Sequence, residues 1–239
     1  MKTHFRYCLF ILFLFLSIGV FAQNKDKGVP NLSTFDEKPL HFGFLLGFNT
    51  MDFKVLNSDI ANDLNENSPI YGDVIHLQPG INIGIVTNLR LRKQLDLRFL
   101  PGISFGQRDL YFISKGGEEE DVPLEIKSTF LEFPLLIRYS AVRQQNFKPY
   151  VIGGVNGRID LAKSKKDKIV LNPLDVYMEI GAGIDTYLTY FRLSIELKAS
   201  YGLTNVLNKK GTGEEADMIY TQAIDKLTSN IFHLTFYFE

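Results

Sequence analysis

The sequence predicts an all-β protein: an eight-stranded, antiparallel, up-and-down transmembrane β-barrel with short periplasmic turns and long extracellular loops. Three observations predict it. Apolar and polar residues alternate with period 2 through eight long segments, short and long connections alternate along the chain, and the polar faces of the segments carry charges of both signs. The composition agrees, because the chain has 20 Phe and 11 Tyr and is 45% hydrophobic, which excludes a disordered protein.

The first 22 residues have the features of a signal peptide. Lys2 and Arg6 precede an apolar run from Cys8 to Ala22, and small residues at Val20 and Ala22 suit cleavage before residue 23. The run is short for a spanning helix, which needs roughly 20 apolar residues; an uncleaved anchor is the alternative. Residues 23–40 are polar and are expected to form a flexible periplasmic lead-in, and residues 41–239 to form the barrel.

The clearest alternation runs from Phe191 to Tyr201, where apolar residues occupy the odd positions and polar residues the even ones. Seven further segments follow the same rule, and each is longer than the 5–6 residues of an average globular strand. They are residues 41–53, 74–91, 94–108, 126–141, 147–161, 174–188 and 229–239. Eight strands is a common size for a single-chain membrane barrel.

The connections between these segments differ in length in a regular way. Those near 89–94, 142–146 and 189–190 are short, whereas those near 54–73, 109–125, 162–173 and 202–228 are long and polar. This order is typical of a membrane barrel whose turns are periplasmic and whose loops are extracellular. It places both chain ends on the periplasmic side.

The side chains decide which face points to lipid. The apolar faces are bulky, and eight such stripes would overfill the narrow interior of an eight-stranded barrel, so they are expected to face outward. The opposite faces carry five acidic and five basic residues, expected to form a structural charge network in the lumen: Asp96, Arg98, Glu132, Arg138, Arg158, Glu179, Asp185, Arg192, Glu196 and Lys198. An ion or proton pathway is the functional alternative.

One turn allows the pairing within this network to be predicted. A tight turn at residues 189–190 places Asp185 diagonal to Arg192 and Glu179 diagonal to Lys198, within reach of long side chains. The same register sets Gly183 opposite Glu196 and Gly181 opposite Lys198, which leaves room for the larger partner.

No motif in the chain assembles into a catalytic or binding site. Residues 102–106 match the G-x-S-x-G pattern, but a nucleophile elbow needs a strand-to-helix turn, and Ser104 lies within an alternating strand. His41, His76 and His233 lack metal-ligand spacing. The acidic residues 118–121, the basic residues 163–168 and the segment 211–215 are interpreted as solvated loops. We therefore expect no enzyme activity, no cofactor, no metal and no small-molecule substrate, and the net charge of −1 argues against nucleic-acid binding.

Four segments, in this order, resemble strands of the PorT family. They are residues 41–53 (HFGFLLGFNTMDF), 95–108 (LDLRFLPGISFGQR), 128–139 (STFLEFPLLIRY) and 149–154 (PYVIGG). The resemblance implies an outer-membrane β-barrel of the Bacteroidota with an accessory or assembly role in the type IX secretion system, and in gliding motility where that machinery is present. It implies contacts with outer-membrane lipid and with other secretion-system proteins, and no catalytic residues.

Other functions remain open at this point. The main alternative is a general structural, adhesin-like or narrow porin-like outer-membrane barrel unrelated to secretion. A membrane-embedded hydrolase would need Ser, His and carboxylate groups that converge on one rim, and a soluble ligand-binding barrel would need its apolar face turned inward.

Overall fold

The computed structural model describes residues 30–57, 70–114, 124–161, 171–208 and 224–239. The described elements are one 3-10 helix and ten strands, and they belong to one compact unit, Asn31–Glu239. Their bounds are η2 Phe35–Glu37, β1 Leu40–Asn57, β2 Ile70–Leu77, β3 Pro79–Arg92, β4 Leu95–Phe99, β5 Gly102–Ser114, β6 Leu124–Ser140, β7 Phe147–Asp160, β8 Leu174–Tyr187, β9 Arg192–Gly202 and β10 Ile224–Phe238. Within these ranges, no helix is both long and apolar enough to cross a membrane.

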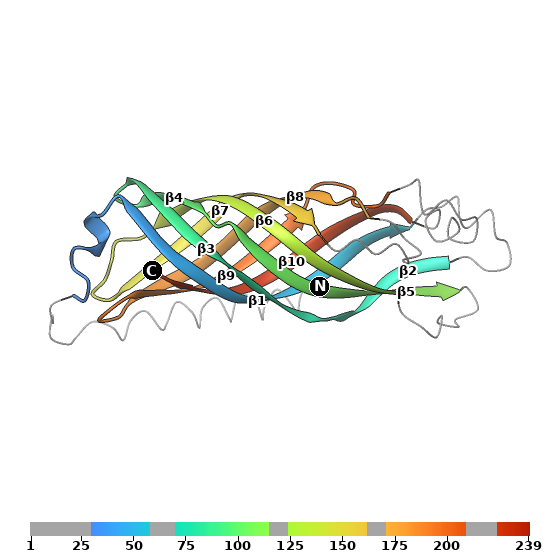
Figure 1. Cartoon of the computed structure of the whole chain (residues 1–239), viewed down its shortest axis with the longest axis horizontal. Helices are drawn as coiled ribbons and strands as arrows, with labels where there is room; N and C mark the ends of the chain where they lie inside the picture. The colour runs from blue at the N-terminus through green and yellow to red at the C-terminus, as the bar shows by residue number, and fades with distance from the viewer. Residues whose placement is uncertain (1–29, 58–69, 115–123, 162–170, 209–223) are drawn as a thin grey trace, which may run out of the picture. The chain divides into compact units, whose positions relative to one another are not determined.

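The strands form one antiparallel sheet that closes on itself. Neighbours follow the order β1–β10–β9–β8–β7–β6–β4–β3, and β3 pairs back onto β1. Leu46 of β1, for example, lies opposite Phe236 of β10 on one side and Ile83 of β3 on the other. Figure 1 shows the strands tilted around this ring. The predicted all-β, antiparallel ring is therefore confirmed.

The strand count differs from the predicted eight, because the sheet contains ten strands, eight of which close the ring. The segment predicted as 94–108 is divided into β4 and β5 at Leu100 and Pro101, although both strands pair with β3 and with β6. A proline lacks the N–H that continues a ladder, which explains this break. The segment predicted as 74–91 is likewise divided into β2 and β3 at Gln78.

The short connections lie where they were expected, and several strands at the opposite end of the barrel extend further than predicted. Short links of residues 93–94, 141–146 and 188–191 join β3 to β4, β6 to β7 and β8 to β9. At the opposite end the strands run on: β1 reaches Asn57, and β10 starts at Ile224, five residues before the predicted 229. Backbone pairing continues there after the sequence alternation fades, so alternation alone underestimates these strands.

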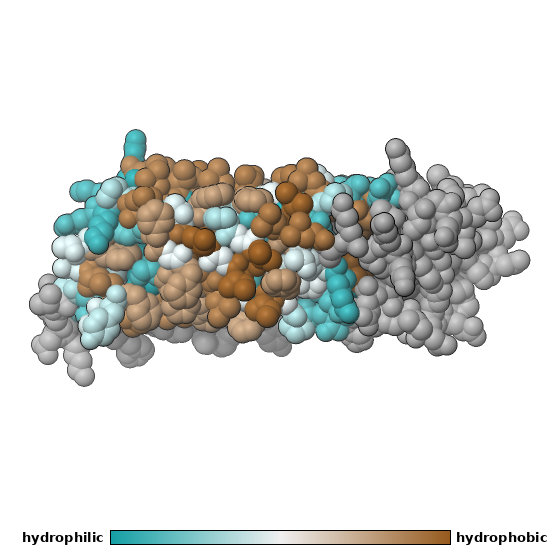
Figure 2. Space-filling view, viewed as in Figure 1, coloured by the Kyte–Doolittle hydropathy of each residue, from teal (hydrophilic) through white to brown (hydrophobic). Residues whose placement is uncertain are grey.

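The apolar residues of the barrel face outward. The predicted stripe on β6 is exposed at Phe133, Leu135, Ile137 and Tyr139, and Leu197 on β9 is 66% exposed. Figure 2 shows the resulting broad brown band on the face of the barrel that is in view. The buried residues are instead mainly polar, and the largest fully buried side chains include five arginines: Arg98, Arg108, Arg138, Arg158 and Arg192. This is the reverse of a soluble protein, in which large apolar side chains form the core.

The interior also contains apolar layers that the sequence analysis did not predict. Along β1, Leu45, Met51 and Phe53 enter three successive buried clusters. The cluster around Phe53 includes Val206, Leu207, Ile224 and Leu227 and lies toward the end of the barrel with the long connections. Apolar layers therefore separate and cover the charged groups within the lumen.

Part of the predicted lead-in has a defined local structure. Residues 31–39, called the strap below, form a turn and η2 and lie against the barrel end that carries the short turns (Figure 1). Asn31 N–H donates to Asn146 Oδ1 at 2.9 Å, and the Arg90 N–H donates to the Pro39 carbonyl at 2.8 Å. No sequence pattern indicated these contacts, because the strap lies outside the alternating segments. Residues 23–29 lie outside the described part.

Candidate functional site

All ten charged residues predicted for the lumen are buried, and each lies within ion-pair distance of an opposite charge. Alternation explains their position, because each of these ten residues has the parity that faces away from lipid in its own strand. They gather in two clusters at different depths, and Asp96 lies apart, 3.6 Å from Arg90 Nε.

The first cluster, the turn-side cluster, joins β4, β6, β8, β9 and the residue that follows β10. Arg98 Nη2 lies 2.9 Å from Glu239 Oε1, and Arg192 pairs with the other oxygen of the same carboxylate. Arg192 Nη1 also lies 3.7 Å from Asp185 Oδ2, which in turn pairs with Arg138. Three arginines thus share two carboxylates, so each carboxylate bridges strands that are not neighbours in the ring.

Tyrosines complete the turn-side cluster. The hydroxyls of Tyr150 and Tyr237 donate to the two oxygens of Glu196 at 2.9 and 2.6 Å, and Arg98 Nη1 lies 3.6 Å from Oε2 of the same group. The guanidinium carbon of Arg138 lies 3.8 Å from the centre of the Tyr150 ring. Buried charges are tolerated only when such partners satisfy their remaining donors and acceptors.

The second cluster, the mid-lumen cluster, is centred on Glu179 of β8. Its carboxylate lies 2.8 Å from Lys198 Nζ and 3.0 Å from Arg158 Nη2, and it accepts from Asn156 Nδ2 at 2.8 Å. Arg158 Nε lies 3.1 Å from Glu132 Oε1 on β6. The cluster therefore links β6, β7, β8 and β9 across the lumen.

The register predicted from the β8–β9 turn is the one observed. Tyr187 pairs with Arg192, so Asp185 lies diagonal to Arg192, and Glu179 is diagonal to Lys198 in the same ladder. Gly181 lies opposite Lys198 and Gly183 opposite Glu196, as predicted. A Cβ on Gly183 would lie 2.6 Å from the Ile195 carbonyl and from the Tyr150 hydroxyl, so this position is filled by its neighbours.

Several buried polar residues were missed by the sequence analysis. Tyr237 and His233 of β10 share one parity with Glu239, which follows the strand and whose side chain is shielded, and Tyr150 shares the parity of Arg158 in β7, so alternation could have placed all of them inside. Tyrosines were overlooked because they also occur on lipid-facing positions. Arg108 was overlooked because its strand was predicted to end there.

Arg108 lies deeper toward the long connections than the two clusters. It is 1% exposed, and its Nη1 donates to Ser229 Oγ at 2.9 Å while its Nη2 donates to Ser128 Oγ. Its guanidinium carbon lies 4.0 Å from the Phe53 ring centre and 5.4 Å from that of Phe130. Hydroxyls and aromatic faces here replace the carboxylates that hold the other arginines.

A third group, the strap site, lies at the mouth beneath the strap. Asp36 Oδ1 lies 3.1 Å from Arg90 Nη2 and 3.2 Å from Lys148 Nζ, and it accepts from the Tyr187 hydroxyl at 2.9 Å. Arg143 Nη1 lies 3.7 Å from Oδ2. Burial alone would raise the pKa of Asp36, but the charge of Lys148 and the hydrogen bonds from Tyr187, Lys148 and Arg90 outweigh it and lower the pKa to about 2.

The motifs discounted in the sequence occupy ordinary structural positions where they are described. Ser104 is fully buried within β5 and lies opposite Asn82, without the turn that a nucleophile elbow requires. His41 stacks on Phe35 at 4.2 Å, and His233 Nε2 lies 3.1 Å from Arg158 Nη2. The side chain of His76 and the segments 118–121, 163–168 and 211–215 lie outside the described residues. Among the described residues, no group of three or more His, Cys, Asp or Glu side chains is placed to hold a metal ion.

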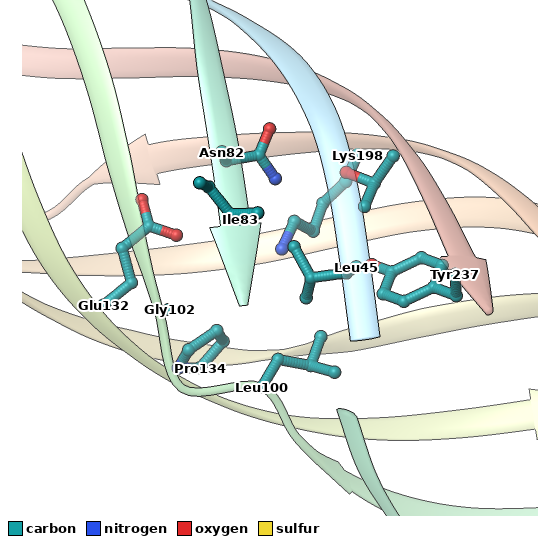
Figure 3. A pocket seen from close by; sticks show the side chains of 10 residues that line it. Leu45, Asn82, Ile83, Leu100, Gly102, Glu132, Pro134, Lys198 and Tyr237 are labelled. Atoms are coloured by element: carbon teal, nitrogen blue, oxygen red, sulfur yellow. The ribbon is translucent and has the colours of Figure 1, made fainter. Parts of the chain in front are cut away.

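A small gap remains between the clusters, and Figure 3 shows Glu132 and Lys198 on opposite sides of it. Asn82 and Tyr237 also line it. The volume open to the centre of a water molecule is about 10 Å³, which is roughly the room for one buried water. The gap is too small for an organic ligand, which needs a pocket of about 300 Å³ or more.

No curated protein matches the chain. Among solved structures, the outer membrane protein OprG from Pseudomonas aeruginosa is similar at a TM-score of 0.45 and 14% identity, covering 90% of this chain and 98% of that chain. Ail, the attachment invasion locus protein of Yersinia pestis, solved in complex with the heparin analogue sucrose octasulfate, is similar at a TM-score of 0.35 and 12% identity, covering 82% and 96%.

The family assignment comes from a family model that covers most of the chain. The model of the outer membrane protein β-barrel domain matches residues 21–208. The outward apolar band and the buried charges are the arrangement that a membrane barrel requires, with lipid outside and polar groups inside. The chain therefore belongs to the outer membrane protein β-barrel domain family, and it is an outer-membrane β-barrel protein.

Proposed function

We propose that this outer-membrane barrel is an accessory or assembly component of the type IX protein secretion system, and of the gliding machinery where that is present. The observation that carries the proposal is the ordered resemblance of residues 41–53, 95–108, 128–139 and 149–154 to the PorT family. These segments fall on β1, β4 with β5, β6 and β7, which are parts of the ring. The barrel is proposed to act through protein–protein contacts and not through catalysis.

The filled lumen supports a role that does not conduct the exported protein. Glu179, Asp185 and Glu239 each bridge basic residues across the interior, and the gap beside Glu132 has room for about one water molecule. A polypeptide that passed through would have to break these ion pairs and leave buried charges without partners, at a cost of several kcal/mol each. The barrel is therefore proposed to act through protein contacts made by its rim, its loops or its periplasmic end.

The proposed orientation follows from the connections. The links 93–94, 141–146 and 188–191 are placed on the periplasmic side with both chain ends, and the long connections are placed outside. A cleaved signal peptide, residues 1–22, is proposed to deliver the chain to the periplasm. The acidic residues 118–121 and the basic residues 163–168, which lie outside the described residues, belong to long connections in the sequence and are proposed to offer opposite charges to partners.

The experiment compares strains of the source bacterium with and without this gene. Cargo proteins that bear the C-terminal export domain are quantified by mass spectrometry in medium, cell surface and periplasm. We expect cargo to accumulate in the periplasm after depletion and to leave it when a plasmid copy is supplied. Unchanged export from an intact outer membrane would contradict the secretion role and favour a structural, adhesin-like or narrow porin-like barrel.

Variants of the plasmid copy can distinguish the loss of a protein–protein contact from the loss of folding. Neutralising the lysines of residues 163–168 tests the outer surface, and Gly157→Ala serves as the control because a Cβ there would meet no atom within 4 Å. Each variant is first checked for wild-type levels in the outer membrane. Planar-bilayer conductance of the purified barrel then tests the porin-like alternative directly: a filled lumen predicts no steady conductance.

A further inference from the structure

The strap holds two neighbouring side chains against the barrel as a ligand would be held. The Asp36 carboxylate occupies the strap site, and the ring of Phe35 stacks on His41 at 4.2 Å and lies edge-on to Tyr187 at 6.1 Å. The guanidinium carbon of Arg192 lies 4.7 Å from the centre of the same ring. The barrel thus contacts an aromatic ring and a carboxylate from two neighbouring residues of the strap.

The barrel supplies this site in full. Arg90 comes from β3, Arg143 from the β6–β7 link, Lys148 from β7 and Tyr187 from β8. Lys148 is 4% exposed, and among the described residues its ion pair is with Asp36 alone. Without the strap, three cations and a tyrosine hydroxyl would converge on an empty position at the mouth, which is a built acceptor for a carboxylate.

The strap is held by hydrogen bonds, ion pairs and the Phe35 ring contacts, and not by fully buried side chains. None of its residues is fully buried, and Ser33, Thr34, Glu37, Lys38 and Pro39 are exposed. Leu32 adopts φ 50°, a left-handed conformation that a non-glycine residue enters at a cost. A segment without fully buried side chains opens more readily than the strands it covers.

We propose that the strap site is a binding site for an aromatic–acidic peptide of a partner protein, and that Phe35 and Asp36 occupy it in cis as an autoinhibitory contact. The strap is tethered, so it acts at an effective concentration of about millimolar for a short linker. A partner peptide must therefore displace it. The inference goes beyond the proposed role in secretion and does not depend on it, because the site is tested on the purified barrel.

The first experiment measures docking of the strap in the full-length protein. The chain contains no Trp, so Phe35→Trp introduces the sole tryptophan and reports its surroundings without background. We expect blue-shifted emission that is protected from iodide in detergent. Adding Asp36→Asn is expected to red-shift the emission and expose it to iodide. Glu37→Gln is the matched control, because this neighbouring carboxylate is exposed and should leave the emission unchanged.

The second experiment measures binding in trans. A fluorescein-labelled peptide of residues 31–39 is titrated against the wild type and against the full-length double variant Phe35→Ala/Asp36→Ala, in which the site is vacated. We expect the double variant to bind the peptide at least about tenfold more tightly, because the wild-type site is open only in a minor fraction of molecules. A peptide with Asn in place of the aspartate should not bind, and adding Lys148→Met to the double variant should abolish binding.

Two results would overturn the proposal. One is equal affinity of the peptide for wild type and double variant, and the other is no binding to a double variant that is folded. Folding of each variant is judged independently by its circular dichroism spectrum and melting temperature in detergent. A normal secretion phenotype would bear on the role in export but would leave this binding result unaffected.

Discussion

Lys198 Nζ lies 2.8 Å from Glu179 Oε2 inside the barrel, across the β8–β9 ladder, with both side chains almost completely shielded from solvent. In water such a pair would contribute little, but in a closed lumen each charge depends on the other. The relationship explains why a membrane barrel can place this many ionised residues inside: each strand brings its charge to a partner on another strand.

The Glu179–Lys198 pair should show strong coupling. Glu179→Gln removes the partner of Lys198 and one partner of Arg158, and is expected to cost about 3–5 kcal/mol of unfolding free energy. The double variant Glu179→Gln/Lys198→Met should cost less than the sum of the single variants, with a coupling of about 0.5–3 kcal/mol. Urea unfolding of the barrel in detergent measures both quantities. Additive costs would mean that the two groups do not interact.

Arg192→Ala should destabilise the barrel far more than removal of an exposed charge. Arg192 pairs with both Asp185 and Glu239, so its loss leaves two carboxylates short of a partner, at about 3–5 kcal/mol. Lys226→Ala is the control, because Lys226 is exposed and its replacement should stay within about 0.5 kcal/mol. Melting temperatures in detergent compare the two. Similar shifts would argue against a stabilising charge network.

Glycine substitutions should distinguish crowded from open positions. Gly183→Ala is expected to destabilise the barrel by about 1–3 kcal/mol, because its Cβ would lie 2.6 Å from the Ile195 carbonyl. Gly157→Ala meets no atom within 4 Å and should be neutral or stabilising by about 0.4–1 kcal/mol, since alanine restricts the unfolded chain. Unfolding free energies of the two variants are compared. Equal losses would show that strand glycines are needed for reasons other than space.

A charged residue introduced into the apolar band should destabilise the barrel by an amount that depends on its depth in the bilayer. Leu197 is 66% exposed near the middle of β9, so Leu197→Arg should cost about 2–4 kcal/mol in a lipid bilayer. Leu203 is 56% exposed just beyond the end of β9, and Leu203→Arg should cost only about 0–1 kcal/mol. Folding into lipid vesicles of known thickness measures the difference. The reverse order would place the bilayer elsewhere on the barrel.

Docking of the strap should depend on pH through Asp36. Its pKa of about 2 lies below its ordinary value of 3.8, so the ionised carboxylate stabilises docking above pH 4, and this contribution is lost as the pH falls through 2. The groups that face Asp36 are Arg90, Arg143, Lys148 and the Tyr187 hydroxyl. The emission of Phe35→Trp should therefore shift to the red between pH 4 and 2.

The control for this titration is Asp36→Asn in the same Phe35→Trp background. Asp96 and Glu239 are further carboxylates near the mouth, where they pair with Arg90 and Arg192, and they are present in both proteins. The transition should be absent from the control, whose strap is already released. A transition of the same size in the control would assign the pH dependence to those other carboxylates.

Much of the barrel and of its charge network can be predicted from the sequence because both follow from local rules. Alternation assigns each residue of a long strand to one of two faces, and the excess of bulky apolar side chains over lumen volume decides which face meets lipid. A tight turn fixes the register of β8 against β9, so Glu179 with Lys198 and Asp185 with Arg192 could be paired in advance. These inferences need only strand geometry and the size of the turn.

Only the tertiary structure shows the contacts between residues that are far apart in the sequence and meet when the ring closes. Glu239 follows the last strand, yet it joins Arg98 and Arg192 because closure brings β10 and β4 to the same level of the lumen. Asp36 lies outside every strand, so no periodicity could place it among Arg90, Lys148 and Tyr187. Sequence spacing records which face a side chain points to, but contacts across the lumen depend on the tilt and stagger of all the strands together.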